Sequence, residues 1–213
     1  MLDDLKEELA REARYLAQQG LVAGREGNLS VRRADNVVIK GTGVRMLDAS
    51  PADFSVVDLS GRHIEGPRPS SEVRMHLGVY GARPDAGAIV HVHPAYTLSL
   101  AALGIRPEPY TEEARLYYDR VCAVPRLPPG SLELASAVAS VASSGCSAIL
   151  LEGHGLVFVA RDLKDAVDGA VAEERSSQVQ FMSAMSDLLQ KIYLSCGRSR
   201  GPRGGGRNLA VAH

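Results

Sequence analysis

Residues 90–94 read Val-His-Val-His-Pro, which places two imidazoles two positions apart at the end of an apolar run. Side chains at positions i and i+2 of a β-strand point to the same side. His91 and His93 would therefore aim at one point, as two ligands of a metal ion must. An ordinary pair of packed or surface histidines gives the same pattern, so the pair alone leaves both interpretations open.

A third histidine, His154, stands between Gly153 and Gly155 in the segment Leu-Leu-Glu-Gly-His-Gly-Leu-Val-Phe. Glycines permit a sharp turn between two apolar strands and let an imidazole approach a centre without crowding. Three protein ligands with one open position are typical of catalytic zinc sites. We interpret His76, within a predicted helix, as structural and His63, in a polar hairpin, as solvated.

The segment Pro-Ser-Ser-Glu at residues 69–72 precedes a predicted helix. The N-terminus of a helix offers free N–H groups and a partial positive charge, which bind anions such as phosphate. Ser70 or Ser71 could cap this helix or donate to a phosphate, since an ordinary N-cap shows the same pattern. Glu72 is then either a first-turn acid or a catalytic base.

Two polar turns complete the candidate chemistry. Gly27-Asn28 and Gly41-Thr42-Gly43 stand at the ends of predicted strands. Glycine-flanked amides with short hydroxyls form anion-binding nests. Two ordinary β-turns would look alike.

The elements that must position these residues follow from hydrophobic periodicity and turn residues. Helices are predicted at 2–19, 70–83, 95–104, 128–145 and 162–191, and strands within 28–33, 36–40, 54–59, 62–66, 86–93, 120–127 and 147–160. We expect one domain at 1–195 and a Gly/Arg-rich tail at 196–213, a composition that predicts disorder.

The 213-residue chain is 45% hydrophobic and 23% charged, with a net charge of -1. These values are ordinary for a soluble globular protein and exclude a nucleic-acid or membrane-surface binder by bulk charge. Without an apolar run that could span a bilayer, and with a charged N-terminus, the expected location is cytoplasmic. The widely spaced Cys122, Cys146 and Cys196 are expected to be reduced thiols.

Several segments, in this order, resemble the class II aldolase/adducin family. They are Gly-Asn-Leu-Ser-Val-Arg, Gly-Thr-Gly-Val, Pro-Ser-Ser-Glu, Ala-Ile-Val-His-Val-His-Pro, Pro-Pro-Gly-Ser-Leu-Glu-Leu-Ala and Glu-Gly-His-Gly-Leu-Val. The resemblance runs from about residue 20 to residue 190. It implies a three-layer α/β/α fold around a central, mostly antiparallel sheet. It also implies a homotetramer with active sites at subunit interfaces.

The resemblance implies a role for each matching position. His91, His93, His154 and Glu72 would hold a divalent metal, usually Zn²⁺, and Glu72 would also be the general acid/base. The substrate phosphate would lie among Asn28, Thr42, Gly43, Ser70 and Ser71. A tyrosine from a neighbouring subunit would protonate the aldehyde oxygen. Tyr110 is the first candidate for it and Tyr117 the second.

The implied activity is that of a metal-dependent aldolase. It would cleave a ketose 1-phosphate of the L-fuculose 1-phosphate type into dihydroxyacetone phosphate and an aldehyde. A methylthioribulose-1-phosphate dehydratase and a ribulose-phosphate 4-epimerase share this scaffold and stay open, although family epimerases carry Asp where this chain has Glu72. A non-catalytic, adducin-like interaction module is the third reading. The partner expected is a small-molecule sugar phosphate, with no nucleic acid or membrane.

Overall fold

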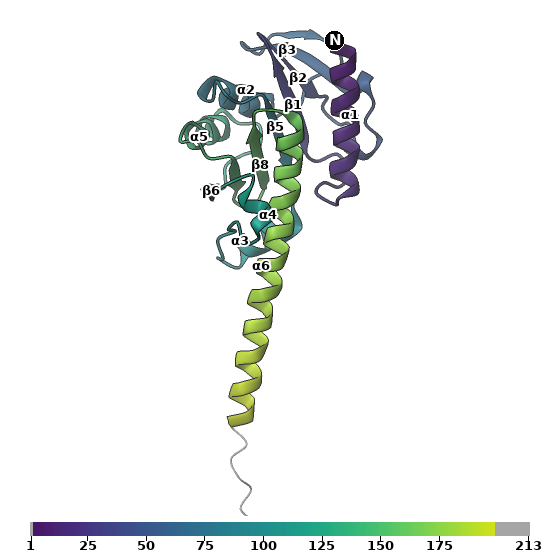
Figure 1. The fold of residues 1–213 in the computed structure, drawn as a ribbon. Helices are drawn as coiled ribbons and strands as arrows, with labels where there is room; N and C mark the ends of the chain where they lie inside the picture. The colour runs from purple at the N-terminus through teal and green to yellow at the C-terminus, as the bar shows by residue number, and fades with distance from the viewer. Residues whose placement is uncertain (1, 199–213) are drawn as a thin grey trace, which may run out of the picture.

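The computed structural model describes residues 2–198 (Figure 1). Its centre is one eight-stranded sheet in the order β4-β3-β2-β1-β5-β8-β7-β6. Neighbouring strands are antiparallel except β6 and β7, which are parallel. The strands are β1 Asn28–Arg33, β2 Asn36–Lys40, β3 Phe54–Asp58, β4 His63–Glu65, β5 Ala88–Val92, β6 Val121–Val124, β7 Ala148–Leu151 and β8 Gly155–Ala160. The predicted mostly antiparallel sheet is confirmed.

Helices cover both faces of this sheet (Figure 1). On one face α1 and α6 pack on a core that includes Leu9, Val90 and Ala166. On the other face α2 and α5 pack on a core that includes Val79 and Val138. The helices are α1 Leu2–Gln18, α2 Val73–Ala82, α3 Ala95–Ala102, α4 Glu112–Arg115, α5 Leu132–Ser143 and α6 Leu163–Arg198, with short 3-10 turns η1 Met46–Asp48 and η2 Pro51–Asp53. The three-layer α/β/α architecture is therefore confirmed.

Serines stand just before both α2 and α5 in the sequence, but only α5 has a serine cap in the structure. At α5 the Ser131 side chain accepts a hydrogen bond from the Leu134 N–H, as an N-cap does. At α2 the N-cap residue is Glu72, and no side chain caps the helix. The expectation that Ser70 or Ser71 caps α2 was wrong. The Ser70 hydroxyl instead accepts from the Glu72 N–H at 3.3 Å, and Glu72 lies before the first helical residue, Val73.

The expectation of reduced thiols was also wrong for one pair. Cys122 and Cys146 form a disulfide with a Cα–Cα distance of 6.5 Å. Parallel pairing of β6 with β7 places Cys122 opposite Ile149, three residues beyond Cys146. Closing a loop of this length typically contributes about 3 kcal/mol to stability. The 24-residue separation conceals the contact in the sequence.

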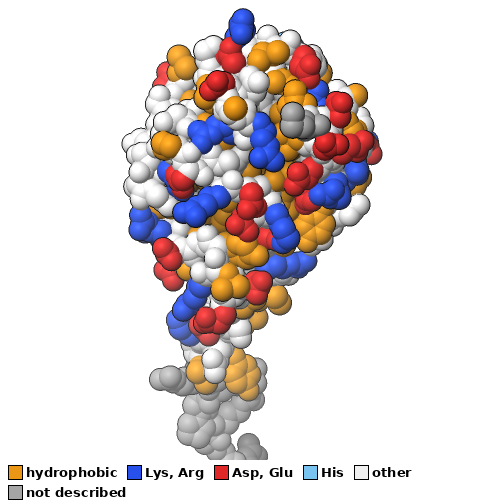
Figure 2. All heavy atoms as spheres, turned by 45° about the horizontal axis from the view of Figure 1, so that its top comes forward, with side chains coloured by type: hydrophobic (Ala, Val, Ile, Leu, Met, Phe, Trp, Pro, Cys, Tyr) orange, Lys and Arg blue, Asp and Glu red, His pale blue; other side chains and the backbone are white. Residues whose placement is uncertain are grey.

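Helix α6 is longer than predicted, because it continues past residue 191 to Arg198. Its C-terminal half projects well beyond the body (Figure 1) and exposes Met182, Leu189, Ile192 and Tyr193. The predicted disorder of the tail falls largely on residues 199–213, which lie outside the described residues. Between residues 2 and 198, no helix is both long and apolar enough to cross a membrane. Figure 2 shows basic and acidic side chains interspersed over one face of the body.

Candidate active site

Strand β5 delivers the first two histidines. His91 lies in the strand and is fully buried, between β1 and β8. His93 follows the strand end, and its main-chain N–H donates to the Leu21 carbonyl at 2.8 Å. The two ring centroids lie 4.9 Å apart. The predicted convergence of this pair is therefore confirmed.

The third histidine arrives from the turn between β7 and β8. Gly153 has a φ of +66°, and the His154 N–H donates to the Leu151 carbonyl at 2.9 Å, which closes the turn. A Cβ at Gly155 would lie 2.9 Å from ring carbons of both His91 and His93. Glycine is required there because any side chain would displace the two imidazoles.

The three imidazoles form a compact cluster. One nitrogen from each of His91, His93 and His154 lies within 4.8 Å of the others. The rings meet edge to face, at interplanar angles of 61°, 71° and 76°. The Nε2 atoms of His91 and His93 are 3.2 Å apart, which allows a proton on only one of them. Each ring thus turns one nitrogen toward a common point, and the rings do not stack face to face.

Glu72 closes the cluster on a fourth side. Its Oε2 lies 3.1 Å from His91 Nε2, and its Oε1 lies 3.6 Å from His154 Nε2. Among the described residues, this buried Oε1 has no hydrogen-bond partner. Three imidazole nitrogens and a carboxylate oxygen that needs a partner are the donor set that Zn²⁺ accepts. The residues present therefore fit a divalent metal.

The charge states of these groups also suit metal binding. Burial alone would raise the pKa of Glu72, but the His91 charge, hydrogen bonds from His91 and Asn28, and His154 together hold it below its usual range. Burial and the neighbouring His91 lower the pKa of His93 to about 4, against the opposing Glu26. Burial likewise lowers the pKa of His154. At neutral pH Glu72 is an ionised carboxylate, and the His93 and His154 imidazoles are neutral, which are the forms that bind metals.

A buried chain of polar groups supports Glu72 from behind. Asn28 Nδ2 donates to Glu72 Oε2 at 3.0 Å, and Asn28 Oδ1 lies 2.5 Å from His76 Nε2. His76 Nδ1 lies 2.7 Å from the Ser30 hydroxyl, which also contacts Tyr80 Oη at 2.8 Å. Burial lowers the pKa of His76 to about 3, so its ring is neutral. If His76 carries its proton on Nε2, it donates to Asn28 Oδ1, and its Nδ1 accepts from the Ser30 hydroxyl.

The structure thus gives Asn28 a contact that the sequence did not indicate. Its amide is only 4% exposed and lies between Glu72 and His76, so one of its two N–H groups is already used by the carboxylate. Its predicted role in phosphate binding stays a prediction.

The other four predicted phosphate residues come together from two distant segments. The Thr42 N–H donates to the Arg68 carbonyl at 2.9 Å, and the Ser70 N–H donates to the Lys40 carbonyl at 3.0 Å. These bonds place Thr42 and Gly43 beside the serine pair that leads to Glu72. Thr42, Gly43 and Ser71 are exposed, and Ser70 is buried. Contact with a phosphate stays a prediction.

Lys40 lies under the loop that carries Thr42 and Gly43, and sequence reasoning did not single it out. Its side chain is buried, and its Nζ donates to the Val44 carbonyl at 2.7 Å, bridging the loop. Burial lowers the pKa of Lys40 to about 8, although Asp53 acts in the opposite direction. Its position in the sequence, directly before the Gly-Thr-Gly turn, was the signal that could have indicated it.

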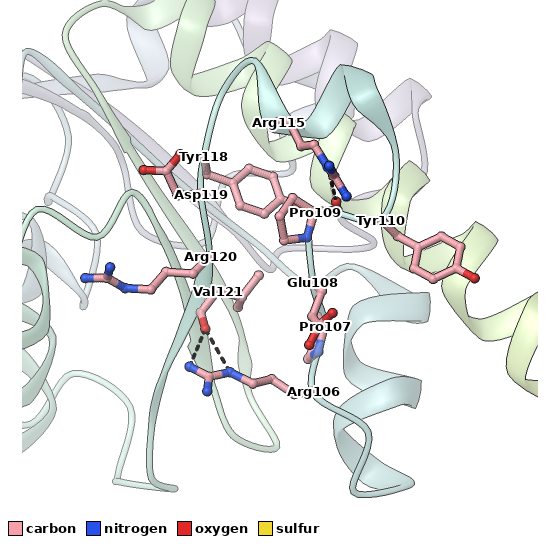
Figure 3. Close-up of a pocket in the computed structure, with 10 residues that line it drawn as sticks. All are labelled: Arg106, Pro107, Glu108, Pro109, Tyr110, Arg115, Tyr118, Asp119, Arg120 and Val121. Carbon is pink, nitrogen blue, oxygen red and sulfur yellow. Dashed lines mark hydrogen bonds between the residues drawn. The ribbon is translucent and has the colours of Figure 1, made fainter.

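The predicted tyrosines lie outside the histidine cluster of their own chain. Tyr110 precedes α4 and is 48% exposed, with its hydroxyl 3.2 Å from Ser183 of α6. Figure 3 shows its ring pointing out of a cavity of about 700 Å³, which is lined by residues 106–110, 115 and 118–121. Tyr117 is half-buried, and burial raises its pKa. The histidines do not line this cavity.

A second cavity, of about 840 Å³, shares Arg106 and Pro107 with the first and is also lined by Leu98, Ile105, Leu150, Glu152 and Gly153. It reaches the turn that carries His154 but is not lined by that histidine. Neither cavity therefore contains the histidine cluster, and of the two it is the second that reaches the turn beside it.

The fold and the site define a class of protein. Residues 7–181 match the family described as "Class II Aldolase and Adducin N-terminal domain", and the chain belongs to this family. The resemblance inferred from the motifs is confirmed.

Individual relatives carry several activities in their names. A 3-oxo-tetronate 4-phosphate decarboxylase of Haemophilus influenzae is 34% identical over 83% of this chain and 86% of its own length. A 5-methylthioribulose-1-phosphate/5-deoxyribulose-1-phosphate aldolase of Rhodospirillum rubrum is 38% identical over 82% of this chain and 79% of its own. A solved L-fuculose 1-phosphate aldolase superposes with a TM-score of 0.78, at 30% identity over 85% of this chain and 86% of the other. The chain is thus a class II aldolase-family enzyme.

Proposed function

We propose that the protein is a metal-dependent aldolase that cleaves a ketose 1-phosphate into dihydroxyacetone phosphate and an aldehyde. The observation that carries this proposal is the place of Glu72. Its carboxylate lies 3.1 Å from His91 and 3.6 Å from His154, and it follows the serine pair directly in sequence. In this proposal the base, Glu72, lies beside both the metal ligands and the serines that bind the phosphate, as the cleavage of a phosphorylated ketose requires.

Each group has a defined task in this proposal. Thr42, Gly43, Ser70 and Ser71 hold the phosphate and so fix the neighbouring carbons against Glu72. In the condensation direction, Glu72 takes a proton from the carbon of dihydroxyacetone phosphate that becomes the nucleophile. A divalent metal at His91, His93 and His154 supplies Lewis acidity for negative charge on the substrate oxygens. Zn²⁺ is the first candidate, and imidazoles also accept other divalent ions.

The proton for the aldehyde oxygen needs a second donor. We propose Tyr110 of a neighbouring subunit, with Tyr117 as the alternative, because Tyr110 is exposed and its ring points out of the cavity, with its hydroxyl against the projecting helix α6. Cleavage reverses both proton transfers. The exposed apolar side chains of α6, among them Met182, Leu189 and Ile192, support self-association. A homotetramer is the assembly proposed.

Three other reactions use similar parts. A dehydratase of the methylthioribulose-1-phosphate type and a decarboxylase like the Haemophilus relative would also place negative charge beside a metal. The epimerase is disfavoured by the glutamate at position 72 in place of aspartate. A non-catalytic adducin-like module has no use for a complete set of His91, His93, His154 and Glu72.

A coupled assay for dihydroxyacetone phosphate tests the proposal. The substrates are L-fuculose 1-phosphate, 5-deoxyribulose 1-phosphate and 5-methylthioribulose 1-phosphate, with 3-oxo-tetronate 4-phosphate scored for carbon dioxide. We expect release from at least one ketose 1-phosphate, lost with a chelator and restored by Zn²⁺. Release of carbon dioxide together with dihydroxyacetone phosphate from 3-oxo-tetronate 4-phosphate, with no cleavage of any ketose 1-phosphate, would replace the aldolase with the decarboxylase.

Histidine variants provide the matched control. His154→Ala should lose both bound metal and activity, because it removes a ligand. His63→Ala should keep both, since His63 is exposed on β4, outside the histidine cluster, and its ring hydrogen-bonds the Glu65 carbonyl. Stoichiometric metal without turnover of any substrate would refute the aldolase, and a wild-type protein that binds no metal would favour the interaction module.

A further inference from the structure

The three imidazoles of the site differ in what holds their second ring nitrogen. His91 Nδ1 lies 3.0 Å from a main-chain carbonyl, that of Leu156. His154 Nδ1 is buried and has no partner among the described residues. His93 Nδ1 lies 3.0 Å from the carboxylate oxygen Oε2 of Glu26. One ligand is thus held by the backbone, one by a charged side chain, and one by neither.

Glu26 is itself fixed in place. Its second oxygen, Oε1, accepts the Ala23 N–H at 2.6 Å, and its own N–H donates to the Ala23 carbonyl at 3.2 Å. The next residue, Gly27, has a φ of +70°, and a Cβ there would lie 2.4 Å from Val22 and 3.0 Å from the His91 carbonyl. The turn that carries Glu26 is therefore pressed against the strand that carries the histidines.

This contact decides which nitrogen of His93 carries the proton. An ionised carboxylate only accepts hydrogen bonds, so Glu26 favours the Nδ1–H form of a neutral imidazole. Nε2 then keeps its lone pair on the side of His91, 3.2 Å away. The opposite tautomer would place a proton in the gap that a metal must enter.

We propose that Glu26 is a positioning residue for the metal centre, which holds His93 in the Nδ1–H tautomer with Nε2 directed at the ion. The inference rests on the proposed metal site. A carboxylate behind a histidine ligand fixes the ring and raises its basicity, and loss of such a partner typically weakens metal binding 10–100-fold. Glu26 touches neither substrate nor metal in this role.

The tautomer can be measured directly in the metal-free protein. With ¹⁵N-labelled histidine, long-range ¹H–¹⁵N spectra distinguish Nδ1–H from Nε2–H for each ring. We expect Nδ1–H for His93 in the wild type and an increased Nε2–H population in Glu26→Ala. An unchanged Nδ1–H tautomer in Glu26→Ala would overturn the proposal, because another group would then fix the ring.

Metal affinity gives the second readout, from Zn²⁺ competition with a chromogenic chelator. We expect Glu26→Ala to bind Zn²⁺ about 10–100-fold more weakly than wild type. Glu26→Gln should lose less, because its amide oxygen still accepts the Nδ1–H. Glu7→Ala, which removes an exposed glutamate from α1, is the matched control and should bind as wild type does. Equal affinity in wild type and Glu26→Ala would also overturn the proposal.

Thermal unfolding of the metal-free variants separates positioning from a general structural role. A lower melting temperature in Glu26→Ala, with tautomer and affinity unchanged, would assign Glu26 to stability alone and refute the inference. Should Glu26→Ala fail to fold, Glu26→Met, which fills the same space without an oxygen acceptor, carries both measurements. A wild type that binds no Zn²⁺ would defeat the proposed function, while the tautomer spectra would still test the contact between Glu26 and His93.

Discussion

The chain buries two glutamates in opposite electrostatic surroundings. Glu72 is 7% exposed and lies beside the histidine cluster, and Glu173 is fully buried between α3 and α6. Burial raises the pKa of both carboxyls. For Glu72 the His91 charge and the hydrogen bonds from His91 and Asn28 outweigh burial. For Glu173 burial dominates, and its pKa rises to about 7.

The partners explain the difference. Glu173 accepts hydrogen bonds from the hydroxyls of Thr97 at 2.5 Å and Ser177 at 2.9 Å, which are neutral donors. The neighbouring carboxylate of Glu174 raises the pKa of Glu173 further. Glu72 lies beside His91 and His154 and accepts a hydrogen bond from the Asn28 amide, and these three neighbours lower its pKa. A buried carboxylate is therefore not by itself a catalytic one, because its neighbours decide whether it is charged at working pH.

The largest expected effect comes from replacing Glu72 by its amide, with the same change at Glu173 as the matched control. Glu72→Gln should lower kcat by about 10²–10⁴-fold, because it removes the group that moves the proton. Glu173→Gln should leave kcat close to that of wild type, since Glu173 lies outside the histidine cluster and accepts hydrogen bonds from the Thr97 and Ser177 hydroxyls. The measurement is kcat on whichever substrate the assay identifies, with the metal content of each variant determined alongside.

This comparison would break in one of two ways. Full activity in Glu72→Gln would remove its catalytic role, whereas a large loss in Glu173→Gln with normal stability would give the buried α3–α6 carboxyl a role in turnover.

The next effect is on stability and depends on pH. Folded Glu173 keeps its proton up to a pH of about 7, whereas a glutamate in the unfolded chain releases it near 4.5. Between these values the folded state binds more protons, so the free energy of unfolding falls as the pH rises. At about 1.4 kcal/mol per pKa unit, the loss reaches about 3 kcal/mol by pH 8. Glu173→Gln should escape this loss.

Urea unfolding of both proteins at pH 5 and pH 8, in chelator, measures the effect. The stability advantage of Glu173→Gln over wild type should grow from the lower to the higher pH. A constant difference between the two proteins would mean that Glu173 titrates normally and that its surroundings do not resist the charge.

The fold and the centre of the site could be predicted because their signals are local. Alternating and helical patterns of apolar residues predicted the strands and helices, and the spacing of His91 and His93 predicted that their side chains point the same way. The third histidine could also be predicted, because Gly155, which follows it in the sequence, is the glycine that the packing of the imidazoles requires. Family motifs then supplied the roles.

What could not be predicted depends on contacts between distant segments. Cys122 and Cys146 meet only because β6 and β7 pair in parallel. Glu26 looks like an ordinary turn residue until β5 brings His93 beside it, 67 positions along the chain. Glu173 lies in an ordinary helical pattern, and no neighbouring residue in the sequence indicates that it is buried against Thr97. Side-chain partners of this kind appear only when the sheet order is known.

The smallest expected effect concerns the support behind Glu72. Tyr80→Phe removes the hydroxyl that donates to the Ser30 carbonyl at 3.0 Å and contacts the Ser30 side chain. It leaves a buried acceptor short of one partner, so we expect a stability loss of about 1 kcal/mol. The contacts of His76 with Asn28 and Ser30 remain, which keeps the Asn28 amide directed at Glu72. Activity should therefore change far less than in Glu72→Gln.

Chemical denaturation and kcat of Tyr80→Phe, measured together, check this expectation. A fall in kcat as deep as that of Glu72→Gln, at nearly unchanged stability, would mean that the Tyr80 hydroxyl controls Glu72 through the whole buried chain. The two glutamates would then differ in a second respect. The charge of Glu173 would depend on its immediate neighbours alone, whereas the function of Glu72 would depend on a group four hydrogen-bond steps away.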